Sequence, residues 1–258
     1  MIDTSLWFLV ATGLASGLLG AMLGIGGGVF IIPVLTLLVR LPMHIAVGSS
    51  LVVVVATAAT AAGRYAYAGI TDIRLGLLLS TTTVVGAIGG ALVAPLLASG
   101  MLKTIFGMLQ FFVAYSMVAG HRHGADGQEA PEGATHVPQG IGLSLFGGIL
   151  SGLLGIGGGI VNLPVLHLVM KVPLKTAIAT SSLMIALTAS ASALVYAYEG
   201  YIYPGIVAPL AVGTMGGAWV GARLGYRASN RALRLGFAAI LVVVGVMMGL
   251  QGRGILLT

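Results

Sequence analysis

The residues with the clearest chemical potential in this sequence are two identical glycine-rich segments. Gly-Ile-Gly-Gly-Gly occupies residues 24–28 and returns letter for letter at residues 155–159, with a proline following each copy, Pro33 and Pro164. Four glycines in five residues interrupt a helix, because each costs about 1 kcal/mol relative to alanine. Where the helix resumes, backbone N–H groups around residues 28–31 and 159–162 lack intrahelical acceptors. With the positive end of the helix dipole, such donors predict anion binding. The alternative is close helix packing through small residues.

Hydroxyl residues form the second repeated feature. Ser49 and Ser50 follow the first glycine segment, and Thr180 and Ser181 follow the second at the same spacing. Such hydroxyls can cap a helix or donate to a bound oxyanion, and the sequence leaves both roles open. We expect both pairs and both breaks to converge on one central site. The predicted substrate-binding residues are Gly26, Gly27, Gly28, Ser49, Ser50, Gly157, Gly158, Gly159, Asn162, Thr180 and Ser181.

Several polar residues lie in apolar sequence without a matching partner in the other half. Asn162 stands where the first half has Ile31, His167 stands in place of Thr36, and Gln110 interrupts an apolar run. Polar groups at membrane depth are functional candidates by default. The predicted proton-relay or gating residues are His44, His167 and Lys175. The alternative for these basic residues is an interfacial position from which the side chain reaches water.

The acidic residues exclude most other chemistries. There are six, at Asp3, Asp72, Asp126, Glu129, Glu132 and Glu199, all in expected termini or connections. No paired carboxylate is available for acid–base catalysis, and no buried carboxylate for carrying a cation. Cysteine is absent and no histidine cluster has metal-ligand spacing, so we expect no enzyme activity, metal or cofactor.

Composition places the chain in the membrane. Of its 258 residues 58% are hydrophobic and only 7% charged, with a mean hydropathy of +1.08. Soluble domains carry about 25% charged residues. Apolar runs such as Leu6–Leu23 reach the length of about 20 residues that a membrane span needs. The fold class is therefore an all-α polytopic membrane protein. The net charge of +6 reflects cytoplasmic loops rather than nucleic-acid binding.

The sequence is organised as a duplication at an offset of 131 residues. About 19 of the 50 positions from Gly24 to Ile73 are identical to their counterparts without a gap. We predict a membrane repeat at residues 1–120, a flexible polar linker at residues 121–139 and a second repeat at residues 140–258. Each repeat has a glycine-broken helix, which gives about 8–10 transmembrane elements in total.

The orientation of the repeats depends on the short apolar pieces after the breaks. Residues 29–39 form about 11 residues, or some 16–17 Å of helix. If such a piece crosses the membrane, each repeat has five elements and the repeats are inverted, which the distribution of basic loops slightly favours. If it does not cross, the repeats run parallel. We expect Tyr65 and Tyr67 to anchor the following helix at the membrane interface.

The duplicated pattern resembles the TauE/SafE family of sulfite and organosulfonate exporters. The pattern consists of the glycine segment, an apolar run to proline, Pro-x-x-x-Ala and a serine-rich helix start. The matching positions are Gly24, Gly26, Gly27, Gly28, Pro33, Ser49 and Ser50, with Gly155, Gly157, Gly158, Gly159, Pro164, Thr180 and Ser181. Ala179 departs from the pattern, since the first repeat has Gly48.

The resemblance implies a bacterial or archaeal inner-membrane carrier that exports sulfite, sulfoacetate or a related small anion. Its expected partners are that anion and the lipid bilayer, and a homodimer stays open. The sequence also leaves open a carrier of another solute or a cation, and a non-transporting membrane subunit.

Overall fold

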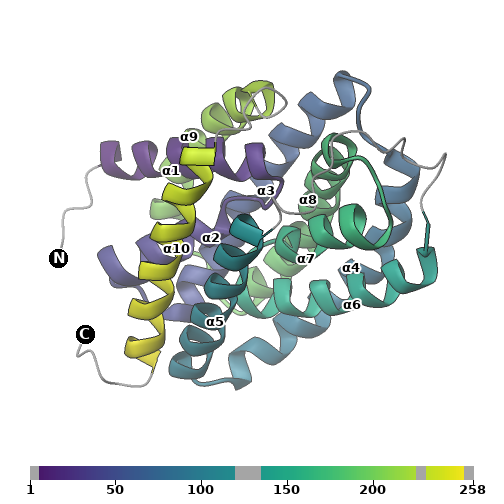
Figure 1. The fold of residues 1–258 in the computed structure, drawn as a ribbon. Coiled ribbons are helices and arrows are strands. Elements are labelled where there is room, and N and C mark those ends of the chain that lie inside the picture. The colour runs from purple at the N-terminus through teal and green to yellow at the C-terminus, as the bar shows by residue number, and fades with distance from the viewer. Residues whose placement is uncertain (1–5, 120–134, 225–230, 253–258) are drawn as a thin grey trace. The chain divides into compact units, whose positions relative to one another are not determined.

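The computed structural model is entirely helical in the residues that it describes, 6–119, 135–224 and 231–252 (Figure 1). The α-helices are α1 (Leu6–Leu23), α2 (Gly28–Pro33), α3 (Met43–Tyr67), α4 (Ile73–Val93), α5 (Ser99–Ala119), α6 (Val137–Leu154), α7 (Gly159–Pro164), α8 (Leu174–Tyr198), α9 (Pro204–Leu224) and α10 (Arg231–Gly252). Shorter helical segments are η1 (Val34–Leu38), η2 (Ala94–Leu96) and η4 (Val165–Val169).

Six of the described helices are long and apolar enough to cross a membrane: α1, α3, α4 with η2, α6, α8 and α9. Shorter apolar helices accompany them, among them Gly28–Leu38 and Gly159–Val169. The predicted class, a multi-pass helical membrane protein, is confirmed by this helix content. The predicted linker at residues 121–139 lies outside the described residues up to position 134, and its last three residues belong to α6.

The two glycine segments end one helix and start the next. Helix α1 ends at Leu23 and α6 at Leu154, and each break contains three glycines with φ between 65° and 82°. These are Gly24, Gly26, Gly27, Gly155, Gly157 and Gly158. A left-handed backbone at three positions in a row of five requires glycine, since other L-residues rarely adopt it. The identical backbone follows from the identical sequence.

Each short helix after a break turns into a π-helical segment at its proline. Pro33 precedes η1 and Pro164 precedes η4, and two residues after the end of each segment stands a basic residue with φ of 60°, Arg40 and Lys171. The N–H of Leu41 donates to Leu35 O at 2.9 Å, which closes a Schellman-type cap. A cation at this end of a helix is stabilised by the helix dipole.

The chain forms two compact units. One contains Met1–Leu96 and Ala130–Tyr226, and the other Leu97–Glu129 and Arg227–Thr258. In the first unit α1 packs on α9, α4 on α6, and α3 on α8. The first two pairs are equivalent under the offset of 131 residues. In the second unit α5 packs on α10, and close approach of Gly107 to Gly245 allows this contact.

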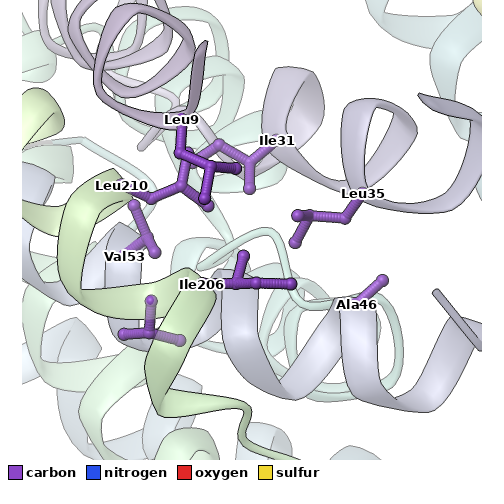
Figure 2. Close-up of a cluster of buried hydrophobic side chains, with 8 residues drawn as sticks. Leu9, Ile31, Leu35, Ala46, Val53, Ile206 and Leu210 are labelled. Atoms are coloured by element: carbon purple, nitrogen blue, oxygen red, sulfur yellow. The ribbon is translucent and has the colours of Figure 1, made fainter. Parts of the chain in front are cut away.

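Matched apolar clusters fill the first unit. One joins α1, α2, η1, α3 and α9 through residues that include Leu9, Ile31, Leu35, Val53 and Leu210 (Figure 2). The other repeats the arrangement around Leu79, Leu166, Ala177 and Met184. Burial of such side chains stabilises the fold by about 1.5–3 kcal/mol for each large residue.

The expectation that Tyr65 and Tyr67 both anchor the helix at the membrane interface is wrong for Tyr65. Tyr67 is 92% exposed and its anchoring role stays a prediction, but Tyr65 is buried and donates its hydroxyl to Ala21 O at 2.9 Å. Tyr196, at the equivalent position in the second half, donates to Gly152 O at 3.1 Å. A buried phenol needs such an acceptor, and α1 and α6 provide it. The hydroxyls of the two tyrosines therefore form hydrogen bonds that connect α3 with α1 and α8 with α6.

Candidate functional site

The two glycine segments lie directly against each other in the core of the first unit. A Cβ atom added to Gly28 would lie 2.8 Å from Gly155 O, and one added to Gly159 would lie 2.7 Å from Gly24 O. Each segment therefore packs backbone against backbone on the other, a distance that only glycine permits. The side chains of Val54 and Ile185 adjoin this crossing: Val54 would lie 3.0 Å from a Cβ added to Gly28, and Ile185 would lie 2.5 Å from a Cβ added to Gly159.

Ser50 and Ser181 connect the glycine segments to the long helices of the opposite half. Ser50 Oγ donates to Gly155 O at 2.9 Å, and Ser181 Oγ donates to Gly24 O at 2.9 Å. Each hydroxyl is also within 3.1 Å of a carbonyl of its own helix. A serine hydroxyl has a single hydrogen to donate. In this conformation that hydrogen is directed to these protein carbonyls and is not available to a ligand.

Ser49 and Thr180 accept hydrogen bonds that also cross between the halves. The N–H of Tyr203 donates to Ser49 Oγ at 3.1 Å, and the N–H of Asp72 donates to Thr180 Oγ1 at 3.0 Å. All four hydroxyl residues are completely buried. The structure thus brings the two predicted hydroxyl pairs and the two breaks together, each pair bonding to the half to which it does not belong.

The backbone donors at the helix starts are fewer than expected. The N–H groups of Phe30 and Ile31 both donate to Gly27 O, at 3.0 and 3.2 Å. Those of Val161 and Asn162 donate to Gly158 O in the same way. The expectation that donors extend over 28–31 and 159–162 is therefore wrong at the last two positions of each range. The cap residue is a glycine whose carbonyl already points along the new helix.

Asn162 is the most unusual polar residue in the site. Its side chain is completely buried, and neither its Nδ2 nor its Oδ1 has a hydrogen-bond partner among the described residues. Ser151 and Ser144 on α6 are also completely buried, with hydroxyls that lack a partner there. Each such group costs about 1–3 kcal/mol if it stays unpaired.

Sequence reasoning identified Asn162 and missed the two serines. Both had a detectable signal: at the offset of 131 residues Ser144 aligns with Gly13 and Ser151 with Gly20. Serines are common in membrane helices and usually bond to their own backbone, so single serines attract little attention. Ser16, for example, donates to Gly13 O at 3.0 Å.

The predicted proton-relay and gating residues contact parts of the chain outside the glycine segments. His44 stacks on Tyr201 with ring centroids 5.5 Å apart, and its Nε2 lies 3.2 Å from Ala94 O. His167 Nδ1 lies 3.0 Å from Val172 O in the connection after η4. Lys175 is exposed at the start of α8. Their proposed gating role remains a prediction.

The buried part of the described chain is free of charged side chains. Every polar side chain in its core is a serine, threonine, asparagine or glutamine. Asp72 caps α4 by accepting from the N–H of Leu75 at 2.9 Å. Among the described residues no group of histidine, cysteine or acidic side chains is arranged to hold a metal ion. Neutral hydroxyls, one amide and backbone groups are the chemistry available at the crossing.

The long apolar helices and the neutral polar core define a multi-pass membrane protein. The chain belongs to the TauE/SafE family: residues 9–248 match the model of the sulfite exporter TauE/SafE. This is a family of transporters and not of enzymes. The match covers both glycine segments and both hydroxyl pairs.

Curated relatives extend over almost the whole chain. It is 27% identical to the probable membrane transporter protein YunE of Bacillus subtilis, with 94% of this chain and 95% of the relative covered. It is 30% identical to the probable membrane transporter protein MJ0441 of Methanocaldococcus jannaschii, with 93% and 94% covered. A probable membrane transporter protein of Xylella fastidiosa is 27% identical, with 92% and 94% covered. No solved structure matches significantly.

Proposed function

We propose that the protein exports small anions, such as sulfite, sulfoacetate or another organosulfonate, across a bacterial or archaeal plasma membrane. Transport proceeds by alternating access between the two repeats. The observation that supports this most directly is the crossing of the two glycine segments, where each segment starts a new helix. A helix start favours negative charge, and glycine lets a ligand approach the backbone closely.

The polarity of the core supports an anion over a cation. Cation carriers hold their ion with carboxylates or with several converging carbonyls, and no described core residue is acidic. Hydroxyl, amide and backbone N–H groups are hydrogen-bond donors that suit oxyanions. Neutral donors also release the ion more readily than an arginine or lysine would, because no full charge opposes its departure.

Alternating access requires the two glycine segments to separate. In the present conformation Gly28 packs on the carbonyl of Gly155, and the space between the segments is filled by Val54 and Ile185. The hydrogen bonds of Ser50 and Ser181 hold the segments in this closed arrangement. In the proposed cycle one of these bonds breaks at a time, which frees a serine hydroxyl to donate to the substrate.

The membrane potential is sufficient to drive export. A cell interior is negative, so a monovalent anion leaving it gains about 2.3 kcal/mol per 100 mV. Inverted repeats suit this cycle, because the inward-facing and outward-facing states are then related by pseudo-symmetry. Proton coupling through His167 would add a second driving force. A homodimer is not needed for the mechanism.

Currents on solid-supported membranes test the proposal. Proteoliposomes containing the full chain are exposed to sulfite, sulfoacetate and sulfate, and to a series of cations as chlorides. We expect transient currents with at least one sulfur oxyanion and none with the cations. Gly28→Ala should abolish the current, while Gly216→Ala, which meets no atom within 4 Å, should retain it.

Three results would contradict the proposal. Currents with cations alone would indicate a cation carrier. The absence of current with every ion, in correctly inserted protein, would favour a non-transporting subunit in which the glycines only pack helices. An undiminished current in folded Gly28→Ala protein would remove the crossing from the transport path.

A further inference from the structure

The second half of the core contains polar groups that the first half lacks. Asn162 and Ser151 stand where the duplication has Ile31 and Gly20. Both are completely buried, and their side-chain polar atoms have no partner among the described residues. Native proteins rarely leave such groups unpaired, so each calls for a ligand or an ordered water.

The first half shows what the same position looks like without a ligand. Ile31 packs into the apolar cluster with Leu9 and Leu35 (Figure 2). Gly20, at the position equivalent to Ser151, has no side chain and packs against the backbone of Gly27. The first half therefore packs well with an apolar residue and a glycine at these two positions. The polar residues of the second half are not required by the architecture of the repeat.

Asn162 and Ser151 face the same place beside Gly158. A Cβ atom on Gly158 would lie 3.2 Å from Asn162 Nδ2 and 3.5 Å from Ser151 Cβ. The amide oxygen lies on the other side, 3.3 Å from a Cβ added to Gly147. The Asn162 amide nitrogen from α7 and the Ser151 side chain from α6 thus both adjoin the second glycine segment, one residue from the position where Gly159 meets Gly24 O.

We propose that Asn162 and Ser151 bind oxygen atoms of the transported anion and determine its specificity. This inference rests on the proposed anion transport and assigns the discrimination between anions to the second half. The amide supplies two N–H donors and the hydroxyl one O–H donor, which match the oxygens of a sulfite or sulfonate group. Unlike Ser50 and Ser181, neither residue must first break a protein hydrogen bond.

The asymmetry has a consequence for the substrate. A two-fold symmetric site would offer the same donors to both ends of a ligand. Here the Asn162 and Ser151 donors lie in the second half, and the first half presents the apolar side chain of Ile31 at the position equivalent to Asn162. The site therefore suits an anion with one oxygen-rich head group rather than a symmetric dianion. Sulfite and sulfoacetate should differ in affinity according to the group opposite the head.

Binding to purified full-length protein tests the inference, with sodium sulfite and sodium sulfoacetate as probes and sodium chloride at equal ionic strength as reference. We expect Asn162→Leu to weaken sulfite binding about 10- to 100-fold and Ser151→Ala about 3- to 10-fold. The control is Ser144→Ala. This serine is also buried and has no hydroxyl partner within the described part of the chain, but it lies two helical turns from Ser151, or about 10 Å. The Ser144→Ala variant should bind sulfite as the wild type does.

Thermal unfolding without ligand completes the test. Removing an unpaired polar group should leave the melting temperature of Asn162→Leu unchanged or raised. Sulfite binding that is unaltered in Asn162→Leu and Ser151→Ala overturns the inference while the proposed function stands, and the groups then hold water. An equal loss of sulfite affinity in Ser144→Ala also overturns the inference, because the loss would then result from altered packing of α6. Wild-type protein that binds neither anion refutes the proposed function itself.

Discussion

The hydrogen bonds of Ser50 and Ser181 to the opposite glycine segments should stabilise the closed conformation measurably. Each joins a completely buried hydroxyl to a buried carbonyl at 2.9 Å. A hydrogen bond of this kind contributes about 0.5–1.5 kcal/mol net, and a buried carbonyl left unpaired raises the loss toward 1–3 kcal/mol. We expect Ser50→Ala and Ser181→Ala each to lower the free energy of unfolding by about 1–2 kcal/mol.

This loss can be measured as a shift in melting temperature. For a protein of this size, 1 kcal/mol corresponds to about 2–4 °C, so each variant should unfold about 2–8 °C below the wild type in detergent. The control is Ser16→Ala. Ser16 is equally buried, but its hydroxyl donates to Gly13 O within its own helix, where such a bond adds little stability. We expect its melting temperature to fall by less than about 2 °C.

One result would refute the reasoning about the serine bonds. If both variants unfold at the same temperature as Ser16→Ala, the two bonds do not hold the repeats together. The proposed cycle would then need another interaction to keep the closed state. The two effects should be similar in size, because the two bonds have the same length and equivalent positions.

Two further predictions concern the packing around the site. Gly159→Ala should destabilise the protein by several kcal/mol, because its Cβ would meet the backbone at Gly24 O and Ile25 Cα, both at 2.7 Å. Chemical denaturation should show this loss, whereas Gly216→Ala, with open space around it, should match the wild type. Tyr196→Phe should cost about 1 kcal/mol, since it leaves Gly152 O without its phenol donor; an unchanged denaturation midpoint would contradict the role of this bond.

Much of the architecture could be predicted from the sequence because its causes are local. The membrane class follows from the length and polarity of apolar runs such as Leu6–Leu23, and the helix α1 has those bounds. The two breaks follow from glycine, whose backbone freedom acts on the residue itself. The prolines after them mark the start of η1 and η4, although the π-helical turns were not predicted.

For the candidate site, the sequence predicted which residues take part but not which groups they contact. The duplication indicated that Ser50 and Ser181 have equivalent roles, but not that each bonds to the other half. Ser50 and Gly155 are 105 residues apart, and Ser181 and Gly24 are 157 apart. No local pattern encodes which carbonyl a hydroxyl meets over such separations, because the packing of whole helices decides it.

The sequence by itself determined that this is a duplicated, helical membrane protein with two glycine breaks and a core almost without charge. Only the tertiary structure decided which polar groups are satisfied. It buried Tyr65 against α1 and placed Ser50 and Ser181 against the carbonyls of Gly155 and Gly24. It left the polar side-chain atoms of Asn162 and Ser151 without partners among the residues that the structure describes. The physical reason is that residue type fixes how many hydrogen bonds a group can make, whereas the packing of distant helices fixes how many it finds.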